Sequence, residues 1–200
     1  MIKIERNYSP ENQKNLENEF SETDIICPEY FSNIHIDLHY DASLIDKDVK
    51  NRILSNIDKL QFLPHIHEKV NEIISQIDNS DSLGISIRTW KASHETNINR
   101  KYSSSRYKIL IKKIVTKNKI SHIIISCDND QEISSYSSFF RSLNIPHIIL
   151  ERILNLSPLE NVVVKFLVLS KLKYIIATRI SSFTELIYWF EKMNPKIFTI

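Results

Sequence analysis

Residues 157–190, SPLENVVVKFLVLSKLKYIIATRISSFTELIYWF, carry the clearest signals of secondary structure in this sequence. It begins with a helix start signal, because Ser157 precedes a proline suited to the first helical turn and is followed three residues later by Glu160. Two helices with a short isoleucine-rich strand between them are predicted here, over Pro158–Lys171, Tyr174–Thr178 and Phe183–Lys192. Ser182 and Glu185 repeat the S-x-x-E pattern before the second helix. A short apolar strand between helices is typical of a parallel sheet that helices cover on both faces.

The same alternation extends back along the chain. Further strands are predicted over Leu83–Arg88, His122–Cys127, Pro146–Glu151 and Lys196–Ile200, and further helices over Ser103–Lys117 and Asp130–Leu143. This order predicts an α/β fold for residues 81–200, a Rossmann-like doubly wound parallel sheet. Residues 1–80 differ, since two amphipathic helices are predicted over Asp46–Leu60 and Pro64–Ile77, before a polar loop at 78–82. We therefore expect a short, mainly helical N-terminal portion, with the boundary near residue 80.

Composition excludes several classes of function. A net charge of +2 does not favour nucleic acid as a partner. The single glycine, Gly84, excludes a P-loop and a GxGxxG dinucleotide site, and we expect it to allow close packing of its strand. Cys27 and Cys127 are far apart, which suits a reducing compartment. With no apolar run long enough to span a bilayer, we expect a cytoplasmic protein, or one peripheral to the inner face of a membrane.

Charged and hydroxyl side chains follow the predicted strands. In a parallel α/β sheet, ligands bind beyond the carboxyl ends of the strands. The residues expected there are Arg88, Lys91, Asp128, Glu151, Arg179, Ser181 and Ser182. Guanidinium groups and a helix N-terminus suit a diphosphate, and the acids could contact a ribose or base. Pairing of Arg88 and Arg179 with Asp128 and Glu151, without a ligand, is an equally good interpretation.

Three segments, taken in order, resemble a known family. They are LGISIRTW at 83–90, HIIISCDND at 122–130, and the stretch at 157–190. Their order and spacing resemble the C-terminal, donor-binding half of the fucosyltransferase-like glycosyltransferases. That superfamily has the GT-B fold and includes the alpha-1,2-, alpha-1,6- and O-fucosyltransferases.

The resemblance implies an enzyme that transfers a fucose-like sugar from a nucleoside diphosphate sugar, commonly GDP-fucose, to a glycan acceptor. Transfer would be inverting and independent of a metal, with no cofactor beside the donor substrate. Arg88 matches the arginine that holds the diphosphate, and Asp128 matches an acid near the nucleotide. Ser182, with Ser181 and Thr184, matches a serine-rich turn that contacts the diphosphate. A fixed arginine and a helix N-terminus would stabilise the charge that develops on the leaving group.

The sequence also departs from the family pattern. Ser86 replaces the motif histidine, Thr89 replaces a second arginine, and Lys165 replaces an acid in the last motif. Family members carry a complete N-terminal domain, which residues 1–80 are too short to supply, so a partner subunit could supply it. The alternative to an active enzyme is therefore a non-catalytic remnant that acts as an interaction or regulatory subunit.

Two further sets of residues have side chains suited to chemistry. Glu95 or His94 could accept the acceptor's proton, or both could be exposed loop residues. His35, Asp37 and His39 would share one face of a strand, which suits a metal, but an amphipathic strand explains them as well. We therefore predict no metal site and take Glu95 as the candidate base.

Overall fold

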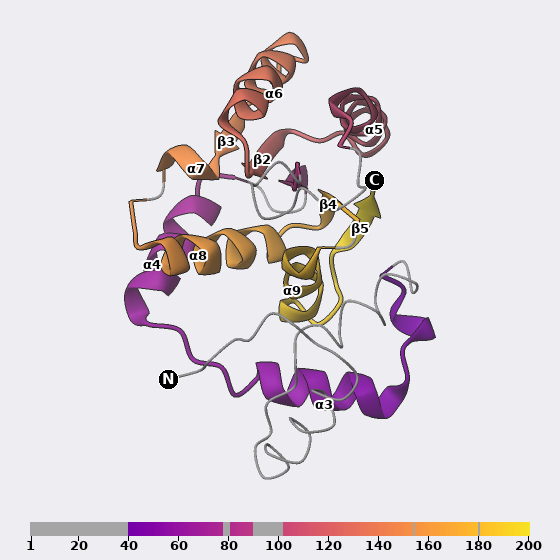
Figure 1. The fold of residues 1–200 in the computed structure, drawn as a ribbon, viewed down its shortest axis with the longest axis vertical. Coiled ribbons are helices and arrows are strands. Elements are labelled where there is room, and N and C mark those ends of the chain that lie inside the picture. Colours follow the sequence, from indigo (N-terminus) through magenta and orange to yellow (C-terminus); the bar gives the residue numbers. More distant parts are fainter. Residues whose placement is uncertain (1–39, 78–80, 90–101, 154, 180) are drawn as a thin grey trace, which may run out of the picture.

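The protein is described by a computed structural model over residues 40–77, 81–89, 102–153, 155–179 and 181–200. Its centre is a five-stranded sheet in the order β3-β2-β1-β4-β5, and each neighbouring pair is parallel (Figure 1). The strands are β1 (Ser82–Ile87), β2 (His122–Cys127), β3 (His147–Ile149), β4 (Tyr174–Ala177) and β5 (Lys196–Thr199). The Rossmann-like α/β fold is thereby confirmed.

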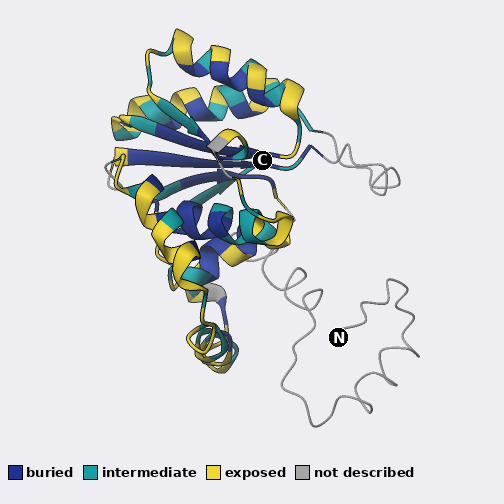
Figure 2. Ribbon diagram, turned by 90° about the vertical axis from the view of Figure 1, so that its left-hand side faces the viewer, coloured by how far each residue is buried: buried dark blue, intermediate teal, exposed yellow. Residues whose placement is uncertain are grey.

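Helices cover both faces of this sheet, which Figure 2 shows as a buried layer between them. On one face lie α5 (Ser104–Asn118) and α6 (Asp130–Ser142), which pack against strand residues such as Ile85 and Ile125. On the other face lie α4 (Pro64–Ile74), α8 (Pro158–Ser170) and α9 (Ser182–Phe190). Burial on both sides explains why the strands are almost continuously apolar. No helix in the described residues is both long and apolar enough to cross a bilayer.

The remaining elements extend the second face. The short helix η1 (Ala42–Leu44) and helix α3 (Lys47–Ile57) precede α4, and α7 (Leu150–Ile153) follows β3. Ile53 of α3 packs with Tyr188 and Trp189 of α9, in a small cluster separate from the two main cores. The predicted helical character of the N-terminal portion is confirmed for residues 40–77. The domain boundary near residue 80 stays a prediction, since residues 78–80 lie outside the described part.

Gly84 lies in the centre of β1, beneath α8. A β-carbon at this position would stand 2.6 Å from Ile175 Cδ1 and 3.0 Å from methyl groups of Leu169 and Leu172. Neighbouring side chains, rather than a neighbouring backbone, therefore fill the space that a side chain would need. The glycine allows the end of α8 and strand β4 to pack directly against β1.

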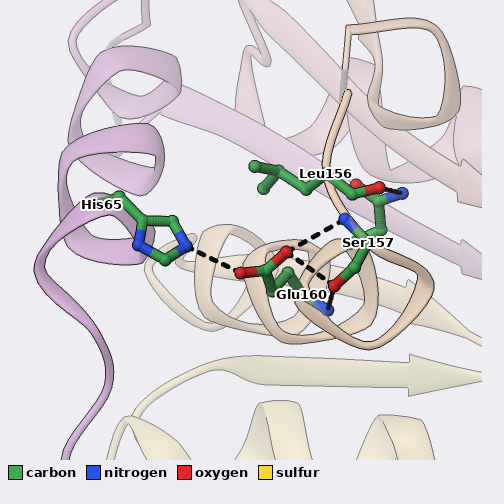
Figure 3. Close-up of polar contacts among 5 residues, drawn as sticks. His65, Leu156, Ser157 and Glu160 are labelled. Carbon is green, nitrogen blue, oxygen red and sulfur yellow. Dashed lines mark hydrogen bonds and ion pairs between the residues drawn. The ribbon is translucent and has the colours of Figure 1, made fainter.

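The start of α8 is held by local and distant contacts. Ser157 and Glu160 form the predicted capping box, in which each side chain bonds to the other residue's backbone N–H (Figure 3). Glu160 Oε1 also lies 2.8 Å from Nε2 of His65 in the first turn of α4. These bonds lower the pKa of Glu160 to about 2. The pair joins α4 to α8 on the outside of the molecule.

Two local predictions were wrong in detail. Strand β3 ends at Ile149, and Glu151 lies in α7 rather than at the end of a strand. Helix α9 has Ser181, not Ser182, as its N-cap, so Glu185 stands one position too late for a capping box. Glu185 is instead buried, with 4% of its surface exposed. In both places the predicted element is present, but its observed boundary differs from the predicted one by one or two residues.

Candidate functional site

The candidate site lies at the carboxyl edge of the sheet, where β1 and β4 are neighbours. From β1 the chain continues to β2 and β3 on one side of that strand, and it then returns to form β4 and β5 on the other side. This is the point at which the order of strands reverses, and α/β proteins bind ligands in the crevice there. Arg88 follows β1 and Thr178 follows β4, so both lie at this point.

Thr178 is the buried centre of the edge. Its Oγ1 accepts a hydrogen bond from the backbone N–H of Arg88 at 2.7 Å. The same oxygen lies 2.6 Å from the hydroxyl of Tyr107, which reaches it from α5. Thr178 N–H in turn donates to the carbonyl of Ser86 at 3.0 Å. The end of β1, from which the Arg88 side chain projects, is thus held by two hydrogen bonds to Thr178, which Tyr107 contacts from α5.

Asp128 lies beside Arg88 from the end of β2. One carboxylate oxygen accepts the backbone N–H of Thr89 at 2.9 Å, and the other lies 3.6 Å from Arg88 Nε. The Arg88 side chain remains 40% exposed and that of Asp128 24% exposed. An ion pair this exposed contributes at most about 1 kcal/mol to stability, and it orients the guanidinium toward the end of β2. The Arg88–Asp128 pairing of the alternative interpretation is therefore present.

The N-terminus of α9 begins at the same edge. Ser181 is the N-cap, and its carbonyl accepts from Thr184 and Glu185, but its hydroxyl caps no described backbone N–H of the helix. Ser182, in the first turn, is exposed. Thr184 is completely buried and donates to the carbonyl of Thr178 at 3.3 Å. The two serines can therefore reach a ligand at the helix N-terminus, whereas Thr184 holds the turn in place.

Arg179 and Glu151 do not form an ion pair with each other. Arg179 is exposed, and no ion pair joins it to another described residue. Glu151 Oε1 lies 2.9 Å from Lys165 Nζ of α8 and accepts from the Ser126 hydroxyl at 2.7 Å and Cys127 N–H at 3.2 Å. This second polar group lies one strand away from Arg88, over the end of β2.

Glu185, near the start of α9, is a buried carboxylic acid. Burial raises the pKa of Glu185 to about 7, and its Oε1 has no hydrogen-bond partner among the described residues. Tyr40 packs nearby, with its ring edge-to-face against Tyr188 at 5.3 Å. Glu185 therefore belongs to the contact between residues 40–57 and α9, rather than to the open edge of the sheet.

Several predicted residues lie outside the described part of the chain. They are Lys91, His94, Glu95 and the set at His35, Asp37 and His39. Among the described residues, no group of three or more His, Cys, Asp or Glu side chains is arranged to hold a metal ion. The structural residues that sequence reasoning missed are Thr178, as a hydrogen-bond acceptor, and Tyr107. Their contacts join positions far apart in the chain, and no local pattern indicates them.

Comparison with known proteins shows which solved structures have a similar fold. No protein-family model and no curated protein sequence matches this chain. Solved structures of POFUT1, an O-fucosyltransferase, are similar in fold: one complex with GDP has a TM-score of 0.55 at 9% identity. A second complex with GDP gives 0.54 at 11%, and one with GDP-fucose gives 0.53 at 11%. These matches cover 77–78% of this chain, and the chain spans 50–51% of the length of those structures.

Proposed function

We propose that this chain is the donor-binding half of a glycosyltransferase that transfers a fucose-like sugar from a nucleoside diphosphate sugar, GDP-linked, to a glycan acceptor. The observation that carries this is the position of Arg88. Its backbone is fixed by Thr178, its side chain stays 40% exposed, and α9 begins beside it. Fold likeness to structures that contain GDP and GDP-fucose supports the same assignment.

Arg88 would stabilise the leaving group. In the proposed transfer, an acceptor oxygen bonds to the anomeric carbon while the bond from that carbon to the diphosphate breaks. The electron pair of the broken bond goes to the diphosphate, whose charge rises in the transition state. A guanidinium held in advance and the free N–H groups of a helix N-terminus stabilise that charge, because they need no reorganisation as it develops. Ser181, Ser182, Arg179 and Lys91 would add hydrogen bonds around the diphosphate.

The other predicted residues have supporting roles in this proposal. Asp128 orients Arg88 through its two contacts, and Thr184 fixes the turn before α9. Glu95 stays the proposed acceptor of the proton that the attacking hydroxyl loses. Inversion at the anomeric carbon follows from a single displacement. Metal independence belongs to the same proposal, and affinity for GDP should then be unchanged by EDTA.

The second candidate is a non-catalytic subunit that keeps the Rossmann-like core. The observation in its favour is the Lys165–Glu151 ion pair, because Lys165 stands where the family resemblance implies an acid. In that role the chain would bind a partner that carries the acceptor side. The two candidates differ in whether the purified chain by itself binds a nucleotide sugar.

Titration calorimetry with GDP, UDP and GDP-fucose, followed by an assay for sugar transfer or donor hydrolysis, tests the proposal. We expect GDP and GDP-fucose to bind with dissociation constants below 1 mM, an affinity of about −4 kcal/mol or better. The absence of binding at millimolar concentration would sink the donor site and favour the interaction subunit. Binding without transfer, restored by adding a partner subunit, would place this chain as one half of a divided enzyme.

A further inference from the structure

We infer that the outer face of α5 docks this protein on a membrane surface that carries anionic phospholipids. The residues of this surface, called the basic face below, are Arg106, Ile109, Lys112, Lys113 and Lys117. It lies on the opposite side of the sheet from α4, α8 and α9, and the proposed sugar transfer uses none of its residues. The inference therefore stands independently of the proposed function.

Positive charge is concentrated on α5. Residues 101–120 include no acidic residue, although the net charge of the whole chain is only +2. The described cations of this segment are Arg106, Lys108, Lys112, Lys113, Lys117 and Lys119. The rest of the chain must therefore carry a net negative charge. Such a local excess of one sign in a nearly neutral chain is typical of a surface that meets a partner of the opposite sign.

The four cations of the basic face are not used inside the protein. All four are exposed, and none forms an ion pair with another residue in the described part of the chain. Lys108 of the same helix differs. Its Nζ donates to Ser135 Oγ of α6 at 2.7 Å and lies over the rings of Tyr136 and Phe139. Packing between helices thus accounts for Lys108 but not for the basic face.

Ile109 lies in the middle of these charges and is 70% exposed. Arg106, Lys112 and Lys113 are three or four residues away from it, so they are its neighbours on the helix surface. A single exposed apolar residue is ordinary by itself. Among cations it has a specific use, because it can enter the boundary between headgroups and acyl chains while the cations contact lipid phosphates.

Helix α6 extends this surface without opposing its charge. The bond from Lys108 to Ser135 joins the two helices. The exposed side chains of α6 beyond its first turn are those of Ser134, Ser138, Arg141 and Ser142. Its two acids, Asp130 and Glu132, are both in the first turn. The two helices together therefore present a broad surface of net positive charge.

An anionic bilayer fits the basic face better than a nucleic acid does. The cations extend over about three turns of helix, roughly 16 Å, and three of the four are lysines. Lysine acts as a point charge and does not fix the orientation of a phosphate as arginine does. Lipid headgroups can move to meet such dispersed charges, and only a bilayer offers Ile109 an apolar environment next to phosphates.

The helix would lie on the membrane as part of the folded domain. Its apolar side chains Tyr107, Ile111 and Ile114 are buried in the core beneath it, so they are not available for insertion. Tyr107 also reaches Thr178 at the carboxyl edge of the sheet. Docking through α5 would therefore hold the candidate site within one layer of helices of the membrane surface.

The test is cosedimentation of the full chain with two kinds of vesicle, phosphatidylcholine alone and phosphatidylcholine mixed with an equal part of phosphatidylglycerol. We expect binding to the mixed vesicles only. High salt should weaken it, because the Debye length shortens from about 10 Å at 0.1 M to about 3 Å at 1 M. Lys112→Gln combined with Lys113→Gln should lower the partition coefficient at least about tenfold, since each cation near an anionic surface contributes about fivefold. Ile109→Ser should lower it about threefold or more.

Lys47→Gln combined with Lys59→Gln is the matched control, because it removes the same charge from exposed positions in and after α3. It should bind the mixed vesicles as the wild type does. The inference is overturned if the wild type does not bind them, if the variants of the basic face bind as the wild type does, or if the control loses as much affinity.

A labelled DNA duplex and a labelled single-stranded RNA distinguish the other anionic partner. If the lysine variant of the basic face loses affinity for either of them and keeps its affinity for the mixed vesicles, the face binds nucleic acid and the inference is overturned. Failure of the wild type to bind GDP would overturn the proposed function and would leave the result with vesicles unchanged.

Discussion

The backbone N–H of Arg88 donates to the hydroxyl of Thr178 at 2.7 Å, and the two residues are 90 positions apart in sequence. This bond joins the end of β1 to the turn that precedes α9. It therefore couples the two features that the proposed diphosphate site requires, a guanidinium and a helix N-terminus. The hydroxyl of Tyr107 completes the arrangement from the other face of the sheet.

Thr178→Val should loosen this junction. The change preserves shape but leaves the Arg88 N–H and the Tyr107 hydroxyl without their shared partner, which costs about 1–3 kcal/mol for buried groups. Urea denaturation should show that loss, and affinity for GDP should fall with it. Thr178→Ser keeps the hydroxyl and is the control. Equal stability of the valine variant and the wild type would contradict the role of this bond.

Gly84→Ala should destabilise the core. The new methyl group would stand 2.6 Å from Ile175 Cδ1, closer than carbon atoms pack. We expect a loss of about 1–2 kcal/mol in the free energy of unfolding, in the range of overpacked cores. Ile175→Val removes the clashing methyl group, so the double variant should be more stable than the sum of the single effects predicts. Strict additivity in that cycle would show that the close approach is not the cause.

Glu185→Gln should change how stability depends on pH. The pKa of Glu185 is raised by burial from 4.5 to about 7, so the folded protein binds the proton more tightly than the unfolded chain. Wild-type stability should therefore fall as pH rises from about 4.5 through 7, by about 3 kcal/mol. The glutamine variant lacks this titration.

Thermal or urea unfolding between pH 4.5 and 8 measures the effect. The Glu185→Gln variant and the wild type should have similar stability at the acidic end, and the variant should be the more stable above pH 7. Burial, and after it the charge of Glu185, raise the pKa of Tyr40, so Tyr40→Phe is a useful companion variant. Parallel stability curves for the wild type and Glu185→Gln would contradict the burial of this acid.

Glu160→Gln should weaken the start of α8. The pKa of Glu160 is lowered to about 2 by the hydroxyl and N–H of Ser157 and by His65, so its charged form stabilises the fold. That contribution is complete above the usual pKa of 4.5 and is lost as pH falls toward 2. The melting temperature of the variant should be below that of the wild type at pH 7, and the gap should narrow in acid.

Glu68→Gln on α4 is the control for this change, because Glu68 is an exposed carboxylate on a neighbouring helix. It should leave the melting temperature close to the wild-type value at both pH values. A constant gap between Glu160→Gln and the wild type from pH 7 to pH 3 would show that charge at residue 160 is not what stabilises the helix.

Much of the fold could be predicted from the sequence because its signals are local. The run HIIISC at 122–127 is bounded as predicted, and Ser157 and Glu160 form the capping box that their spacing indicates. The ends of the helices and strands were predicted less accurately. Leu150 continues an apolar run, yet the chain turns into α7 there, and Ser181 rather than Ser182 caps α9.

The candidate site was predictable only in its location. Rules for parallel sheets place Arg88 and Asp128 at one edge, and the structure brings them together. The partner of Glu151 was not predictable. Lys165 contacts Glu151 from the middle of α8. No spacing in the sequence indicates this contact between α7 and α8.

The most direct test of the central claim is the affinity of GDP for the wild type and for Arg88→Ala. Loss of a charge-assisted contact to the diphosphate should raise the dissociation constant at least about tenfold, because such bonds contribute about 1.5–3 kcal/mol. Arg88→Lys should recover part of the affinity, and Arg52→Ala, at an exposed position on α3, should leave it unchanged. Calorimetry that finds the same dissociation constant for folded Arg88→Ala and the wild type would contradict the account.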